Sequence, residues 1–125
     1  MKPQVQQLIQ RFIQPYREPF KVWVQKLHDV VGTNMELAQE HFAQGQYADA
    51  AFRYRFVAWW APDNFEAWLG LALSEAAMQK WKKARAAVNK AGRLNSKDPR
   101  LTEAIQVIRE AERNAAAPPP PPPPK

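Results

Sequence analysis

The chain has 125 residues, a formal net charge of +6 and no cysteine. Without thiols it forms neither a disulfide nor a cysteine metal site or nucleophile. This length supports one domain, and so small a positive charge does not by itself indicate nucleic acid. No apolar run approaches the roughly 20 residues of a membrane span. The N-terminus has no apolar signal-peptide core, so a cytoplasmic location is expected.

Two helices are predicted in the first part of the chain. Residues 4–14 carry apolar side chains at helical spacing until Pro15 breaks the pattern. A second helical pattern follows and ends at Gly32. We expect residues 1–32 to form a degenerate helical hairpin that caps the domain. A helix lying on a membrane is the alternative, but the polar face of the first segment is rich in glutamine rather than in cations, which favours packing.

Residues 33–62 predict two antiparallel helices joined by a tight turn. Thr33 and Glu36 have the spacing of a capping box at the start of the first helix. Gly45 stands where a left-handed residue ends that helix, and a second helix begins near Tyr47. Small residues on facing positions of the two helices predict a close approach.

A second copy of this pattern covers residues 63–98. The shift that places Leu37 on Leu71 also aligns Ala38 with Ala72, Tyr47 with Trp81, Ala50 with Ala84, and Tyr54 with Val88. The copy has its own predicted capping box at Asp63 and Glu66, and Gln79 replaces the turn glycine. Its closing proline, Pro99, comes three residues late, which predicts a longer helix or a longer turn.

The repeated positions resemble the tetratricopeptide repeat, a unit of two helices that recurs about every 34 residues. The resemblance is carried by Leu37, Ala38, Gly45, Tyr47, Ala50, Tyr54 and Pro62 and by their counterparts in the second copy. His41 and Glu75 depart from the family pattern, which has an aromatic residue there. The resemblance implies an all-α fold, a short right-handed solenoid of antiparallel helix hairpins, and binding of a protein or peptide.

After the repeats we expect a capping helix over residues 99–114 and then a tail. Asp98 followed by Pro99 has the pattern of a helix N-cap with proline in the first turn. Residues 115–125 are rich in alanine and proline, and we expect this polyproline tail to be disordered, with its prolines in the polyproline II conformation. We favour a passive spacer or tail. The alternative, that the prolines are a ligand for a proline-binding groove, stays open.

The resemblance also implies a concave binding groove lined by the first helix of each unit. The corresponding positions are Met35, Gln39, Phe42, Glu66, Leu69, Leu73 and Ala76. They lack the lysine and asparagine with which one subfamily holds C-terminal carboxylates. The mostly apolar groove suits a hydrophobic or amphipathic segment, and coverage by neighbouring helices is the open alternative.

An aromatic stripe distinguishes the first copy from the second. Phe52, Phe56 and Trp59 recur at i, i+4 and i+7, where the second copy has Ala86, Lys90 and Arg93. Three such side chains left in water would form an adhesive patch. We expect the apolar face of residues 4–14 to cover them. A partner protein, which includes a second copy of the chain, is the other candidate cover.

A basic face is predicted on the second helix of the second copy. Its members are Lys83, Lys90, Arg93 and Lys97. A solvated surface is the favoured interpretation. If the face has a function, binding of an acidic protein surface is favoured over binding of nucleic acid. Nucleic-acid binding would favour aromatic side chains that stack on bases, and none is interleaved with these cations.

No catalytic pattern emerges from the sequence. His28 and His41 are the only histidines, and each lies within a helical pattern. We find no nucleophile–base set, carboxylate pair, metal-ligand spacing or phosphate loop, so we expect a non-enzymatic protein without cofactor, metal or small-molecule substrate.

The function indicated is that of an adaptor or scaffold that holds another protein within a larger assembly. Residues 37–88 also resemble bacterial secretion chaperones built from the same repeats, so a dedicated chaperone of a hydrophobic client is the alternative. Binding of nucleic acid or of an anionic membrane through the basic face is the third class.

Overall fold

The computed structural model describes residues 29–124, in which helices are the regular secondary structure and no strand occurs. The chain divides into two compact units, Met1–Thr33 and Asn34–Lys125. Of the first unit only residues 29–33 are described, and they are helical. Most of the predicted hairpin over residues 1–32 therefore lies outside the described residues. The all-α expectation is confirmed.

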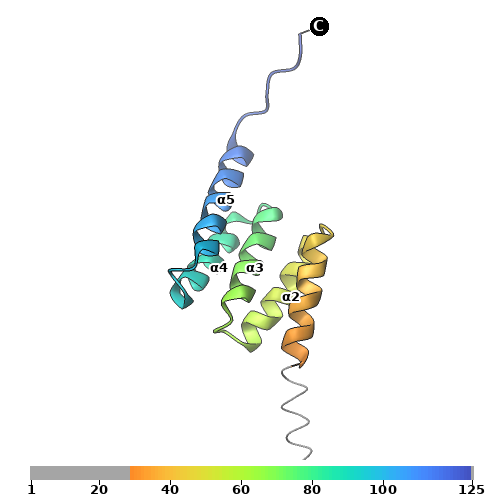
Figure 1. Ribbon diagram of the computed structural model, residues 1–125. Coiled ribbons are helices and arrows are strands. Elements are labelled where there is room, and N and C mark those ends of the chain that lie inside the picture. Colours follow the sequence, from red (N-terminus) through yellow and green to blue (C-terminus); the bar gives the residue numbers. More distant parts are fainter. Residues whose placement is uncertain (1–28, 125) are drawn as a thin grey trace, which may run out of the picture. The chain divides into compact units, whose positions relative to one another are not determined.

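The second unit is built of antiparallel helices packed side by side (Figure 1). After the helical residues 34–43 come α2 (Tyr47–Trp60), α3 (Phe65–Ala77), α4 (Trp81–Leu94) and α5 (Pro99–Ala116). The helix α3 is the central one, since it contacts α2, α4 and α5, and α4 also packs on α5. No helix in the described part of the chain is long and apolar enough to cross a membrane.

The helix boundaries keep the strict period of the sequence repeat. Tyr47 and Trp81 open α2 and α4, which both have 14 residues, and Phe65 and Pro99 open α3 and α5. The predicted longer helix or turn before Pro99 is therefore wrong. That proline does not close the second unit but begins α5, where its missing N–H removes no helical hydrogen bond.

Both predicted capping boxes are wrong. Thr33 lies inside the helical residues 29–43, so the chain does not leave the helix at Gly32; a single glycine within a helix costs only about 1 kcal/mol. Asn64 rather than Asp63 caps α3, and its Oδ1 accepts a hydrogen bond from the Ala67 N–H at 3.1 Å. Asn64 precedes Asp98, the cap of α5, by one full period of the repeat. The two capping residues are therefore at equivalent positions.

The turn after the first helix of each unit is the same hydrogen-bonded structure. The N–H of Gln46 donates to the His41 carbonyl at 2.8 Å, and one period later the N–H of Lys80 donates to the Glu75 carbonyl at 2.9 Å. In each turn the preceding residue has a positive φ, 78° for Gly45 and 61° for Gln79. This is the Schellman arrangement, in which glycine is preferred because a Cβ is strained there. The predicted turn at Gly45 is confirmed.

We expect Gln79→Gly to stabilise the protein by about 1 kcal/mol, because it removes the strain of a left-handed glutamine. The melting temperature should rise by roughly 5 °C in thermal unfolding followed by circular dichroism. Gly45→Gln is the matched control, since it places the same side chain in the equivalent turn and should lower the melting temperature by a similar amount. An unchanged melting temperature in both variants would show that neither turn is strained.

Small residues bring the helices together. Ala38 and Ala50 are fully buried, as the predicted close approach requires. Between α2 and α3 the ring of Tyr54 lies so close to Gly70 that a Cβ there would come within 2.4 Å of ring carbons. Burial raises the pKa of the Tyr54 phenol. The buried core cluster comprises Ala38, Ala50, Ala51, Tyr54, Leu71, Ala72, Ala76, Ala84, Ala87, Val88, Ala91, Leu101 and Ile108.

Gly70→Ala should destabilise the fold by about 2 kcal/mol, since the added methyl group forces Tyr54 out of its position. Chemical denaturation with urea measures the loss. Gly92→Ala serves as the control: it is also a helical glycine, but its Cβ would meet Leu101 at an ordinary 3.5 Å, so helix propensity alone should make it neutral or slightly stabilising. Equal effects of the two substitutions would contradict the close Tyr54–Gly70 contact.

The last helix packs through one face. Leu101, Ala104 and Ile108 are buried, and Ile105 is partly buried against the core. The helix continues to Ala116, two residues beyond the predicted end. Residues 118–124 are exposed and have neither helix nor strand.

Candidate protein-binding surface

Exposed aromatic side chains gather on α2. Trp59 is 72 % exposed and Phe52 is 66 % exposed, and both lie on the same stripe as the partly buried Phe56. Trp60 joins them: its ring stacks on that of Phe56 with centroids 6.3 Å apart and lies 5.9 Å from that of Trp59. We call Phe52, Phe56, Trp59 and Trp60 the aromatic cluster. Trp60 was not among the predicted residues, although it follows Phe56 at the helical spacing of i+4.

The aromatic cluster faces outward because the opposite side of α2 is the packed one. That side buries Ala50, Ala51, Tyr54, Val57 and Ala58. The helix thus has two apolar faces, a buried one made largely of small residues and an exposed one made of large rings. Its expected cover, the apolar face of residues 4–14, lies outside the described residues. An exposed aromatic patch of this kind is typical of a protein-binding surface.

The residues predicted for the concave groove differ widely in exposure. Leu69 and Ala76 are each only 8 % exposed, so neither is open to a partner in this structure. Phe42 packs edge-to-face on Tyr47 at 5.2 Å between centroids. Met35 and Leu73 are also partly buried, whereas Gln39 and Glu66 are exposed. The groove therefore stays a prediction, carried by fewer positions than the sequence suggested.

The four cations of the basic face are exposed, but they do not form one track along α4. This helix ends at Leu94, so Lys97 lies in the following loop. Lys90 instead lies over the indole of Trp68, with its Nζ 5.4 Å from the ring centroid. Lys83 and Lys90 border the pocket described next, and Arg93 does not.

A pocket of about 300 Å³ lies between α2 and α4, with α3 beneath it. We call it the Glu75 pocket. It is lined by Arg55, Trp68, Leu71, Glu75, Lys83, Ala86, Ala87 and Lys90. Glu75 occupies the position at which the resemblance described above has an aromatic residue.

Glu75 is the unusual group in this pocket, because it is a carboxylate that is only 2 % exposed. Its Oε1 forms an ion pair with Arg55 Nη2 at 2.6 Å, and its Oε2 has no hydrogen-bond partner in the described part of the chain. A buried acceptor without a partner costs about 1–3 kcal/mol. Arg55 is half exposed, so solvent screens the ion pair and weakens its favourable electrostatic energy. On this balance we expect Glu75 to lower the free energy of unfolding.

Removing the two partners of this ion pair should have unequal effects. Arg55→Ala leaves a buried carboxylate without its cation, and we expect a loss of about 3 kcal/mol. Glu75→Leu removes both the charge and the unpartnered oxygen, and the half-exposed Arg55 can then be solvated by water. The free energy of unfolding of this variant should therefore equal or exceed that of the unaltered chain. Urea denaturation of both variants and of the double variant measures this; a large loss in Glu75→Leu would show that the carboxylate stabilises the fold.

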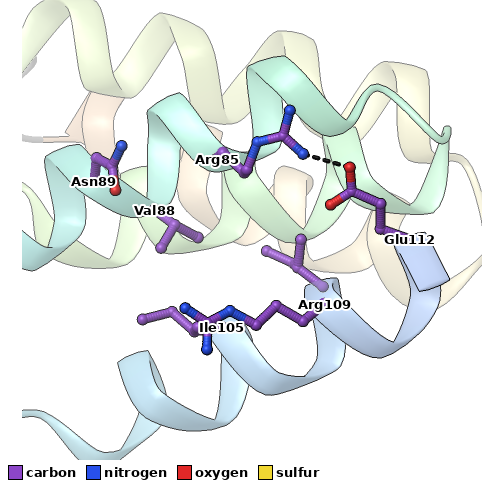
Figure 2. Close-up of a pocket in the computed structure, with 7 residues that line it drawn as sticks. Arg85, Val88, Asn89, Ile105, Arg109 and Glu112 are labelled. Carbon is purple, nitrogen blue, oxygen red and sulfur yellow. Dashed lines mark hydrogen bonds and ion pairs between the residues drawn. The ribbon is translucent and has the colours of Figure 1, made fainter.

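A smaller pocket, of about 170 Å³, lies between α4 and α5 (Figure 2). It is lined by Arg85, Val88, Asn89, Ile105, Ile108, Arg109 and Glu112, and Arg85 donates a hydrogen bond to Glu112 across it. Asn89, Ile105 and Arg109 follow Arg55, Leu71 and Glu75 by one period of the repeat. The two pockets therefore share three equivalent positions, and the second has an arginine where the first has the buried carboxylate.

Several other polar side chains pair with one another or cap a helix. Arg100 hydrogen-bonds to Asp98, which lowers the pKa of the Asp98 carboxyl while that residue caps α5. Glu66, one of the predicted groove residues, pairs with the same arginine at 3.4 Å. His41 Nδ1 lies 2.6 Å from Gln46 Oε1, and His28 is outside the described residues. Across residues 29–124 no group of three or more His, Cys, Asp or Glu side chains could hold a metal ion.

A comparison with protein families matches the tetratricopeptide repeat over residues 41–108, which is more than half of the chain. The chain belongs to the tetratricopeptide repeat family. The match covers α2, α3 and α4 and the first part of α5. Searches of curated proteins and of solved structures found no match. Tetratricopeptide repeats generally bind other proteins or peptides.

Proposed function

We propose that this tetratricopeptide repeat protein is an adaptor that binds a partner protein through the aromatic cluster on α2. The observation that supports the proposal is the exposure of Phe52 and Trp59 on a helix that is already packed through its other side. The packed side of α2 buries Ala50, Ala51, Tyr54, Val57 and Ala58 and includes neither of these rings.

Such a surface is well suited to binding. Each large aromatic side chain buries on the order of 150–250 Å² when covered, and tryptophan is among the residues that dominate binding energies. The rings also stand on a packed helix and contact one another, so they lose little conformational freedom when a partner covers them.

Two other classes of function differ from an adaptor in what they bind. A chaperone for a hydrophobic client would also use the aromatic cluster, and it differs by keeping soluble a client that otherwise aggregates. Binding of nucleic acid would use the basic face. The placement of Lys83 and Lys90 beside a pocket, with Lys97 in a loop, supports an acidic protein surface over a continuous run of phosphates.

Substituting the aromatic cluster tests the proposal. The full chain carrying Phe52→Ser and Trp59→Ser should unfold within about 0.5 kcal/mol of the unaltered chain, because surface substitutions rarely do more. Its principal partner should be lost in quantitative affinity purification. Arg93→Ser is the matched control, since it occupies the position of Trp59 in the second repeat and should retain the partner. Sedimentation velocity of the same proteins shows whether the partner is a second copy. Retention of every partner by the double variant would refute the proposal, and so would unfolding of that variant.

A further inference from the structure

The aromatic cluster and the Glu75 pocket adjoin on the same surface. On α2, Arg55 lies one helical turn after Phe52 and one before Trp59, at spacings of i+3 and i+4. Arg55 also lines the pocket and pairs with Glu75. A partner that covers the aromatic cluster therefore reaches the edge of the Glu75 pocket.

The buried carboxylate indicates what the pocket lacks. Arg55 satisfies one oxygen of Glu75, and the other has no hydrogen-bond partner among residues 29–124. An ionised carboxylate accepts and does not donate, so the missing group is a donor. Glu75 itself lines the pocket, so a donor that enters it lies beside this carboxylate while Arg55 keeps its bond to the first oxygen.

The walls of the pocket are apolar and favour a ring. Trp68 and Leu71 come from α3, and Ala86 and Ala87 come from α4. A space of about 300 Å³ between them accommodates one aromatic side chain. A serine or threonine hydroxyl carries a donor but would leave these walls uncovered, whereas the phenol of tyrosine joins an apolar ring to a donor at its far end.

The charge at the rim of the pocket favours acidic residues on either side of that ring. Arg55, Lys83 and Lys90 outnumber the single carboxylate, so the pocket carries a positive charge. A lysine or arginine from a partner would be repelled there, although each is a donor. Acidic residues beside the ring would be attracted. The ammonium groups of Lys83 and Lys90 also favour an aromatic face, as Lys90 already shows with Trp68.

From these observations we propose that the Glu75 pocket binds a tyrosine side chain within an acidic segment of the partner, whose hydroxyl donates to Glu75. The proposal rests on the proposed function in taking that partner to be a protein on this surface. It also accounts for a buried carboxylate that weakens the fold, because the missing hydrogen bond is completed on binding.

Two synthetic peptides test the proposal with the full chain. They are acetylated and amidated pentapeptides of sequence Asp-Glu-Tyr-Glu-Asp and Asp-Glu-Phe-Glu-Asp, which differ by one hydroxyl group. In a titration followed by nitrogen–proton correlation NMR, the tyrosine peptide should shift the indole signal of Trp68 and the amide signals of Glu75 and Lys90. The phenylalanine peptide should bind about tenfold more weakly, which is the usual effect of losing a hydrogen bond to a charged group.

Variants of exposed residues locate the binding site without disturbing the fold. Lys90→Glu should weaken the tyrosine peptide by about tenfold or more, because it places a carboxylate beside an acidic ligand. Arg93→Glu makes the same charge change on α4 outside the pocket and should have a much smaller effect. Equal affinity of the two peptides, equal effects of the two variants, or no shift of the pocket signals would each overturn the proposal.

The aromatic cluster gives an independent readout. Phe52→Ser with Trp59→Ser should leave the peptide titration unchanged, since the pentapeptide occupies the pocket alone. If this double variant loses its protein partner while the peptides fail to bind, the adaptor function stands and the tyrosine pocket is refuted. If the peptides bind while the double variant keeps its partner, the pocket stands and the aromatic cluster is refuted as the contact.

Discussion

Helices in this protein meet through alanine and glycine, and the core depends on that close approach. Ala38, Ala50, Ala72 and Ala84 are fully buried, and Gly70 leaves no room for a Cβ beside Tyr54. In the described part of the chain the buried core is mostly alanine, and Tyr54 is its one aromatic member. The rings of Phe52 and Trp59 lie on the exposed side of α2.

The Glu75 pocket lies where two helices pack beside one another on α3. At the position where the repeat pattern has an aromatic residue, this chain has a carboxylate. Arg55 partly fills the space and neutralises the charge, but one oxygen stays without a partner in the described part of the chain. A repeat scaffold tolerates such a position because each unit is held mainly by its immediate neighbours.

Much of the fold could be predicted from the sequence, because the repeat period is written in the small core residues and in the turns. Gly45 gave the turn and Tyr47 the start of α2, and both predictions are confirmed. The predictions of helix starts at Thr33 and Asp63 were wrong, because they rested on a local capping pattern. The 34-residue period of the repeat, counted back from Asp98, indicates Asn64 instead. The aromatic stripe emerged from comparing the two copies. The pocket did not, because Arg55, Trp68 and Lys90 come together only when α2, α3 and α4 are packed.

The one-sided packing of α5 gives the protein a gradient of local stability. Its buried residues end at Ile108, and none of the residues from Arg109 to Pro124 is buried. The last two turns of the helix therefore depend on hydrogen bonds within α5 and on few contacts with α4, and the prolines that follow cannot extend it. The C-terminal end of α5 can therefore unfold locally while α3, which is packed against three helices, stays folded. Amide protons near Arg113 accordingly exchange with solvent through local fraying, and those of α3 only through unfolding of the whole array.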